Sequence, residues 1–143
     1  MVREVNANDL DQLLDLYLHL HETEIPPMDD HLKSTWQQIL NDPNYHLIVK
    51  EVDGILVSSC VCVIIPNLTR GVRSYAFVEN VVTREGYRKK GYASECLDYA
   101  KKIAESNDCY KMMLITGSKN PATLNFYKNA GYVDDRTAFY QSI

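Results

Sequence analysis

The sequence predicts an α/β protein in which helices cover both faces of a mixed β-sheet. Strand-like and helix-like segments alternate along 143 residues without a long linker, an internal repeat or a low-complexity tract. Residues 74–83 are rich in β-branched and aromatic side chains, and an amphipathic helical pattern follows over residues 93–105. Asp53-Gly54 separates two apolar runs, which is a strong hairpin signal.

The first third of the chain predicts one short strand and two helices. We expect the strand over residues 2–5, after which Asn6 can cap a helix that ends near His21. Pro26-Pro27 interrupts the helical pattern, and a second helix continues until Asp42-Pro43-Asn44. The apolar stripes of the two helices are Leu10, Leu13, Leu14, Tyr17 and Leu18, and then Leu32, Trp36, Ile39 and Leu40.

The remaining elements are mostly strands. The hairpin at Asp53-Gly54 should join strands over residues 45–52 and 55–65, and residues 66–71 should turn. Beyond the helix at 93–105 we expect a strand over residues 110–116, a helix between Pro121 and Gly131, and a last strand carrying Tyr132, Val133, Phe139 and Tyr140.

Composition bounds the class of protein. The length fits one domain spanning residues 1–143, and a net charge of −4 argues against nucleic acid as the principal partner. The longest apolar stretch, around residues 60–65, is too short to cross a membrane, and the N-terminus lacks a signal-peptide pattern. The four cysteines show no metal-ligand spacing, which indicates reduced core thiols in a cytoplasmic protein.

The most informative segment is Arg88-Lys89-Lys90-Gly91-Tyr92-Ala93, a basic turn between a strand and a helix. Free N–H groups and the positive dipole end at a helix N-terminus stabilise anions, and Gly91 allows a ligand to approach the backbone. Arg84 lies just upstream and adds positive charge. The further glycines of a dinucleotide fingerprint and the Gly-Lys-Ser/Thr of a P-loop are absent. The alternative is a solvated basic loop.

Two motifs resemble those of the GNAT N-acetyltransferases. Arg88-x-x-Gly91-x-Ala93 is similar to the Gln/Arg-x-x-Gly-x-Gly/Ala motif with which that family holds the pyrophosphate of acetyl-CoA. About thirty residues later, the segment from Asn120 to Tyr132 resembles the family's last helix, with tyrosine seven residues after the asparagine and a Gly-aromatic ending. The resemblance implies a mostly antiparallel sheet, acetyl-CoA as cosubstrate and no metal.

The resemblance also assigns the cosubstrate contacts. Main-chain groups of Val81, Val82 and Thr83 are expected to pair with the pantetheine arm. Arg88 begins the motif, and the amides of Lys89, Lys90, Gly91, Tyr92, Ala93 and Ser94 are expected to surround the pyrophosphate. Asn120 is a further expected contact, with a helix N-cap as its alternative role.

Tyr127 occupies the family's acid position, where a phenol donates a proton to the departing thiolate. Its alternative role is that of a core tyrosine beside Phe126. Glu79 is the leading candidate for the base, because a carboxylate within a strand is costly unless it faces a cleft. A solvent-facing strand residue is the equal alternative. Some family members carry a glutamate on the next strand, but Leu114-Ile115-Thr116 stand there. This leaves Glu79 or a chain of waters as the base.

The expected reaction is direct acetyl transfer from acetyl-CoA to a primary amine, most simply that of a small molecule. Acidic residues in segment 22–30, which would lie over the acceptor, favour a cationic amine. Stretches around Phe77, Asn107 and Asn125 resemble glucosamine-phosphate N-acetyltransferases, although Asn80 stands where those enzymes tend to carry aspartate.

Other interpretations stay open at this point. A non-catalytic acyl-CoA-binding module would keep the phosphate turn and need neither acid nor base. A protein or peptide N-acetyltransferase would differ only in its acceptor groove. His19, His21, Glu22 and Glu24 lack a recognised metal-ligand set. Strands late in such folds often pair between subunits, which favours a homodimer.

Overall fold

Five strands form one sheet, in the order β1-β2-β3-β4-β5, in the computed structural model, which describes residues 1–143. The strands are β1 (Val2–Glu4), β2 (Tyr45–Val52), β3 (Ile55–Ile65), β4 (Tyr75–Thr83) and β5 (Met112–Leu114). The first three junctions are antiparallel, and only the β4–β5 junction is parallel. The predicted mixed, mostly antiparallel sheet is therefore confirmed.

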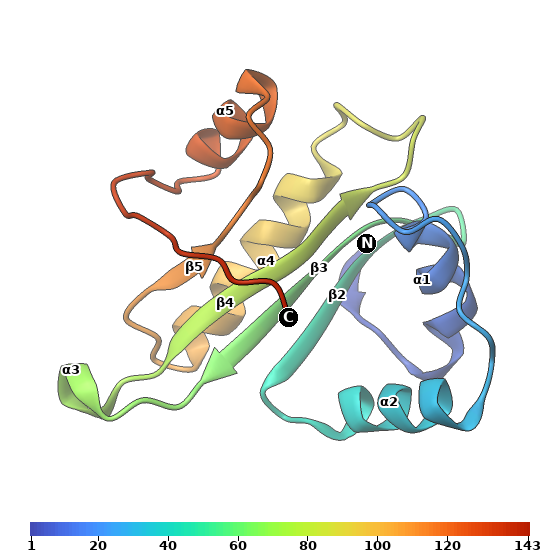
Figure 1. The fold of residues 1–143 in the computed structure, drawn as a ribbon, viewed down its shortest axis with the longest axis horizontal. Helices are drawn as coiled ribbons and strands as arrows, with labels where there is room; N and C mark the ends of the chain where they lie inside the picture. The colour runs from blue at the N-terminus through green and yellow to red at the C-terminus, as the bar shows by residue number, and fades with distance from the viewer.

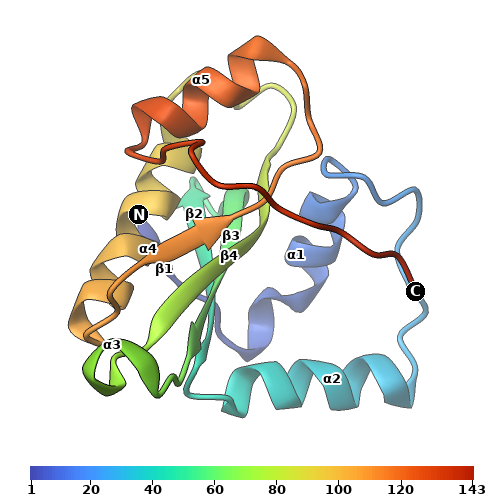
Figure 2. The ribbon, with the colours of Figure 1, turned by 60° about the vertical axis from the view of Figure 1, so that its left-hand side comes forward.

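Helices cover both faces of this sheet (Figures 1 and 2). Helices α1 (Leu10–Tyr17) and α2 (Asp30–Asn41) lie on one face, and α4 (Tyr92–Ser106) lies on the other. Each face has its own apolar cluster: Leu13, Leu16 and Trp36 pack on the first face, and Cys96, Leu97 and Ala100 pack on the second. Helix α5 (Pro121–Asn129) adds Phe126 and Tyr127 to the second cluster.

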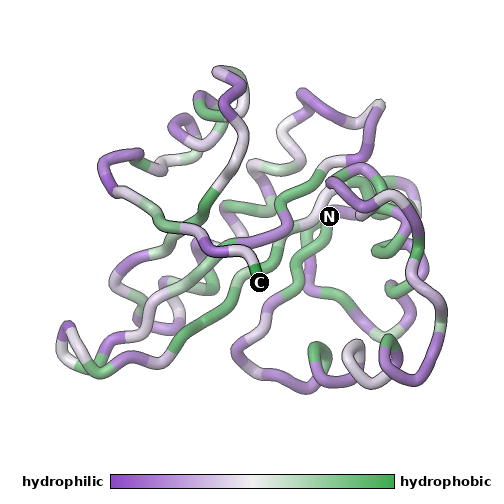
Figure 3. The backbone as a smooth tube through the Cα atoms, viewed as in Figure 1, coloured by the Kyte–Doolittle hydropathy of each residue, from purple (hydrophilic) through white to green (hydrophobic).

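Local sequence signals explain where most elements begin. Asn6 and Asp9 form a capping box, which starts a 3-10 turn (η1, Ala7–Asp9) that leads into α1. Asp29 caps α2 by accepting a hydrogen bond from the Leu32 amide at 2.9 Å. At the β2–β3 hairpin, Asp53 and Gly54 both have positive φ, as the predicted two-residue turn requires. Green stretches in Figure 3 mark the apolar β3 and β4, and purple marks the polar loop from β4 to α4.

A β-bulge bends β4 at Asn80. The register with β3 shifts at this point, because Ser59 pairs with Val82 whereas Val61 pairs with Glu79. Asn80 has φ of 53°, a left-handed conformation that asparagine tolerates better than most residues. On its other side β4 pairs with β5 only from Ala76 to Val78. The last residues of β4 therefore have no strand beside them on that edge.

The predicted last strand is wrong. No regular structure follows Gly131, and Val133, Phe139 and Tyr140 are exposed. A strand needs a partner ladder and a buried face, but the C-terminal segment runs across β4 and β5 instead of along them (Figure 1). The predicted strand over 110–116 shrinks to three residues, and the turn at 66–71 contains a short helix, α3 (Thr69–Val72). No helix has both the length and the apolar character needed to cross a bilayer.

Candidate functional site

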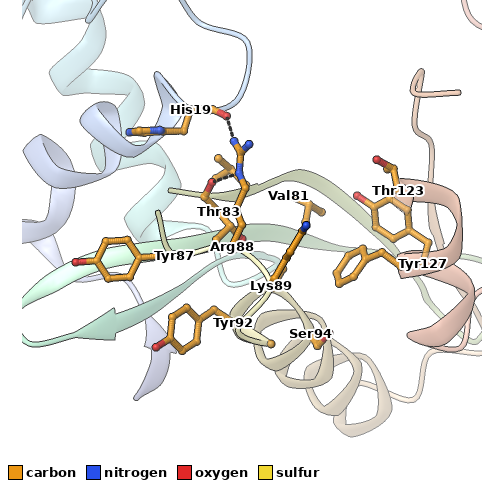
Figure 4. A pocket seen from close by; sticks show the side chains of 14 residues that line it. His19, Val81, Thr83, Tyr87, Arg88, Lys89, Tyr92, Ser94, Thr123 and Tyr127 are labelled. Carbon is orange, nitrogen blue, oxygen red and sulfur yellow. Dashed lines mark hydrogen bonds between the residues drawn. The ribbon is translucent and has the colours of Figure 1, made fainter. Parts of the chain in front are cut away.

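A cleft of about 540 Å³ opens between the end of β4, the first turn of α4 and the side of α5 (Figure 4). Its lining includes most of the residues that the two motifs single out: Val81, Val82, Thr83, Arg88, Lys89, Gly91, Tyr92, Ala93, Ser94 and Tyr127. The fold thus brings together two segments that lie about thirty residues apart in the chain. Lys90, Asn120 and Glu79 lie outside this lining.

The turn before α4 presents unpaired backbone donors. Gly91 is the N-cap of α4 and has φ of 82°, which favours glycine. The amides of Lys89 through Ser94 donate to no acceptor within the protein, and the first helical bond that reaches back to the turn is from the Glu95 amide to the Gly91 carbonyl. A Cβ on Gly91 would meet no protein atom within 4 Å. The space beside Gly91 is therefore available to a ligand.

The four cations of this region divide into two pairs. Arg84 bonds to Asp15 at 2.8 Å and to the Leu56 carbonyl, and it does not line the cleft. Arg88 donates to the carbonyls of Thr83 and His19. Lys89 and Lys90 are exposed, have no carboxylate partner, and remain available for a ligand's phosphates, although Lys90 lies 5.7 Å from the Tyr87 ring centroid. The expected contribution of Arg84 is thus corrected, since its charge is already paired.

The end of β4 offers main-chain groups to the same cleft. The Arg84 amide donates to the Val57 carbonyl at 2.7 Å, so this residue faces β3. Residues alternate direction along a strand, so the main-chain groups of Val82, which pairs with Ser59, also face β3, whereas those of Val81 and Thr83 face the opposite edge. A ligand with amide groups can extend the sheet at this edge.

Tyr127 approaches the cleft from α5. Its ring packs edge-on against Tyr132, with 6.2 Å between ring centroids and an interplanar angle of 84°. Burial raises the pKa of the Tyr127 phenol above its ordinary value, and the nearby Cys60 thiol adds to this shift. A tyrosine phenol is protonated at neutral pH even at its ordinary pKa, so Tyr127 has a proton to donate.

The model of the acetyltransferase (GNAT) family matches residues 10–132. The chain belongs to the GNAT acetyltransferase family. It is therefore an acetyl-CoA-dependent N-acetyltransferase, as the two motifs predicted, and its reaction is acetyl transfer to an amine. Family membership thus favours the enzyme over a non-catalytic binding module.

Individual relatives agree with this assignment. A proposed acetyltransferase from Agrobacterium tumefaciens str. C58 superposes with a TM-score of 0.94 at 34% identity, and the match covers 100% of this chain and 99% of that one. Glucosamine 6-phosphate N-acetyltransferase of Trypanosoma brucei brucei is 28% identical over 92% of this chain and 87% of its own length. The glucosamine-6-phosphate N-acetyltransferase structure from Arabidopsis thaliana shares the fold, with a TM-score of 0.87 at 16% identity, and the match covers 99% of this chain and 97% of that one.

Asn120 takes the capping role in this acetyltransferase. Its side-chain oxygen accepts a hydrogen bond from the Ala122 amide at 3.0 Å at the start of α5, where Pro121 is the first helical residue. It does not line the cleft. Of its two expected roles, the structure therefore provides the N-cap.

Glu79 lies on the opposite face of the sheet from Tyr127. It pairs with Val61, whose side chain belongs to the α1–α2 cluster, and paired residues of an antiparallel ladder project to the same face. Glu79 is exposed, which matches the alternative of a solvent-facing strand residue. Its charge adds to the effect of burial in raising the pKa of Tyr45. Glu79 therefore belongs to the side on which α1 and segment 22–30 lie.

Asn80 shares this side with Glu79 because of the bulge. Its side chain lies near the phenol of Tyr17, whose pKa is raised by burial and by the neighbouring Tyr45 and Cys60, while Asn80 opposes this shift. Two consecutive polar side chains of β4 thus face the residues of α1 and β2. Regular alternation would have placed them on opposite faces.

Sequence reasoning missed four lining residues: His19, Tyr87, Thr123 and Phe126. Thr123 and Phe126 precede Tyr127 by four residues and one residue, and the helical repeat that places Thr123 beside Tyr127 was available as a signal. His19 lies just beyond the end of α1, and no local pattern links it to a turn nearly 70 residues away. His19, His21, Glu22 and Glu24 do not form a metal site, because no group of three or more His, Cys, Asp or Glu side chains is placed to hold a metal ion.

Proposed function

We propose that the cleft binds acetyl-CoA and that the enzyme transfers its acetyl group directly to the primary amine of a small molecule. The observation that carries this proposal is the set of unpaired amides from Lys89 to Ser94, which shares one cleft with the uncovered edge of β4 and with Tyr127. The amides and the two free lysines would take the pyrophosphate and the 3′-phosphate. Val81 and Thr83 would pair with the pantetheine amides.

The reaction requires a neutral amine, an acceptor for the amine's proton, stabilisation of the oxyanion and an acid for the departing thiolate. The neutral amine attacks the thioester carbon, the C–N bond forms as the C–S bond breaks, and the amine loses a proton. Tyr127, which lines the cleft, would donate its phenolic proton to the departing thiolate. Main-chain donors at the bulged end of β4 would stabilise the oxyanion.

Glu79 would receive the amine's proton through water. Water would carry the proton from the amine to Glu79, because Glu79 lies outside the cleft on the α1 side of the sheet, where it is exposed to solvent. A chain of waters without Glu79 is the alternative, and replacement of Glu79 by Gln separates the two. Lower activity of the variant near pH 7 that recovers as the pH rises and the amine deprotonates by itself would support Glu79, whereas an unchanged pH profile would favour water.

The acceptor would enter beside segment 22–30. This segment follows the His19 end of α1, which reaches the cleft, and all of its residues are exposed. Its side chains Glu22, Glu24, Asp29 and Asp30 outnumber its cations, which supports a positively charged amine as the acceptor. An amino-sugar phosphate is a specific candidate, because the trypanosomal relative is a glucosamine 6-phosphate N-acetyltransferase.

A homodimer is part of the same proposal. The C-terminal residues Val133, Phe139, Tyr140 and Ile143 expose apolar side chains, and β5 has a free edge because it is the last strand of the sheet. Both features would be covered if the C-terminal segment of one copy paired with β5 of another. Sedimentation of the full chain and of a chain ending at residue 132 would test this.

The decisive experiment measures thiol release from acetyl-CoA with a panel of amino sugars, amino-sugar phosphates, polyamines and peptides. The proposal expects turnover with a small-molecule amine and a 10²–10⁴-fold lower kcat in Tyr127→Phe, with acetyl-CoA affinity retained. Tyr140→Phe is the matched control, because Tyr140 is exposed. Turnover with peptides alone would contradict the acceptor class, and full activity of Tyr127→Phe would contradict its role as the acid.

A further inference from the structure

His19 joins the end of α1 to the turn between β4 and α4. It lies two residues beyond α1, and its own amide donates to the Leu16 carbonyl at 3.0 Å, which continues the last turn of the helix. Its Nδ1 atom accepts a hydrogen bond from the Glu85 amide at 3.2 Å. Its carbonyl oxygen accepts one from the Arg88 guanidinium at 3.3 Å, which Figure 4 shows as a dashed line.

The bond from Glu85 selects one tautomer of the neutral His19 imidazole. A ring nitrogen that accepts an N–H carries no proton, so the neutral ring carries its proton on Nε2. The Glu85 amide has no other acceptor within the protein. His19 is therefore the residue that holds the first part of the turn in place.

Arg88 makes the second connection. Its Nε atom donates to the Thr83 carbonyl at 3.2 Å while Nη2 reaches the His19 carbonyl, so one guanidinium joins the end of β4 to the end of α1. A cation beside the last carbonyls of a helix is favoured by the helix dipole. The turn is thus held at both Glu85 and Arg88 by one residue, His19, just beyond the end of α1.

The residues that follow need such support. Lys89 has φ of 62° and Gly91 has φ of 82°, and a left-handed conformation is unfavourable for a lysine that nothing else constrains. The amides that these two residues orient point into the cleft without protein partners. If the turn sampled other conformations in the free enzyme, the ligand would have to order it on binding, at a cost in affinity.

We propose that His19 is a positioning residue for acetyl-CoA, which preorganises the phosphate-binding turn by accepting the Glu85 amide. The proposal rests on the proposed function, because it takes the unpaired amides of this turn as the pyrophosphate site. His19 itself does not touch the reacting atoms. Its replacement therefore changes the affinity for acetyl-CoA and leaves the chemical step intact.

Three variants test this. His19→Ala removes the acceptor, and His19→Asn keeps an acceptor oxygen close to the place of Nδ1. His21→Ala is the matched control, because His21 lies on the same loop with a largely exposed side chain. We expect His19→Ala to raise the Kd and KM for acetyl-CoA about fivefold, the value of one hydrogen bond, with kcat at saturation unchanged. His19→Asn and His21→Ala should bind as the wild type does.

Hydrogen exchange of the Glu85 amide supplies a readout without ligand. Exchange should accelerate in His19→Ala and stay slow in His19→Asn. Equal exchange and equal affinity in all variants would overturn the role of His19, and so would an equal loss in His19→Ala and His19→Asn. A wild type that does not bind acetyl-CoA at all would overturn the proposed function and this proposal with it, whereas a change confined to kcat would overturn only this proposal.

Discussion

Arg84 and Asp15 form an ion pair, with 2.8 Å between the guanidinium Nη1 and the carboxylate Oδ2. The pair links the residue after β4 to α1. Arg84 is the cation upstream of Arg88, Lys89 and Lys90 that we expected to add to the charge of the basic turn, and the ion pair already engages it. Arg88 is also engaged, through two carbonyl groups. The turn therefore keeps two free charges for a ligand, and the other two hold its shape.

Because only Lys89 and Lys90 of these four cations are unpaired, their replacement should affect acetyl-CoA binding. Lys89→Ala and Lys90→Ala should each weaken acetyl-CoA binding about three- to tenfold, because each would remove an unpaired positive charge from the proposed phosphate-binding turn. The loss should shrink at high salt, which screens exposed charges. Lys101→Ala is the control, since Lys101 lies on the exposed side of α4 with only a loose pair to Glu105 at 4.0 Å. Calorimetric titration at two salt concentrations measures this, and equal effects of all three variants would contradict it.

Gly91 and Gly54 offer a matched comparison. Both have positive φ near 80°, and at both a Cβ would meet no protein atom within 4 Å. Alanine at either position should therefore cost a similar free energy of unfolding, about 1 kcal/mol. Only Gly91→Ala should also weaken acetyl-CoA binding, by tenfold or more, because its methyl group projects where the pyrophosphate would approach. Denaturant unfolding and a binding titration distinguish strain from lost contact, and equal acetyl-CoA affinity of the two variants would refute the site.

Replacement of Asp9, which lies away from the cleft, should change the free energy of unfolding by a large amount. Its carboxylate is only 6% exposed, accepts from Arg3 at 2.7 and 3.0 Å, and also accepts from the Asn6 amide. Asp9→Asn should lower the free energy of unfolding by about 2–3 kcal/mol, because the Arg3 charge loses its main partner. Glu105→Gln, at an exposed pair, should change it by less than about 0.5 kcal/mol. Urea unfolding measures both.

The Asp9 pair also predicts a pH dependence. The hydrogen bonds from Arg3 hold the pKa of Asp9 below its ordinary value in the folded protein. The unfolded state therefore takes up the proton first as the pH falls, and the wild type loses this stabilisation below about pH 4. Asp9→Asn should lack this part of the acid-induced decrease. Identical acid slopes in wild type and variant would show that Asp9 does not contribute.

Buried thiols predict a decrease of stability at alkaline pH. Burial raises the pKa of Cys62 and of Cys96 to about 11. Above pH 9 the unfolded thiols lose their protons while the folded ones keep them, so the free energy of unfolding falls, by roughly 2 kcal/mol for each thiol at pH 11. Cys96→Ala should flatten this slope by about a third, because Cys62 and Cys60, whose pKa burial also raises, still contribute, and Cys109→Ala, at a less buried thiol, should flatten it less. Thermal unfolding between pH 8 and pH 11 measures the difference.

The sequence by itself determined the features that depend on neighbouring residues. Asn6 and Asp29 cap helices, Asp53-Gly54 turns a hairpin, and Gly91 opens α4, because each depends on backbone conformation within a few positions. The resemblance to two family motifs singled out Tyr127 and the turn before α4, and both line the cleft. The last strand failed because its stability depends on a partner that the sequence does not reveal.

Only the tertiary structure decided which side chains are free to act. The choice between a cap and a cosubstrate contact at Asn120, the face on which Glu79 projects, and the carbonyl partners of Arg88 all depend on which groups compete for the same donor or acceptor. His19 and Glu85 are 66 residues apart in the chain and meet through the packing of α1 on the sheet. A hydrogen bond across that separation has no sequence period, because it exists only after both elements have folded onto one core.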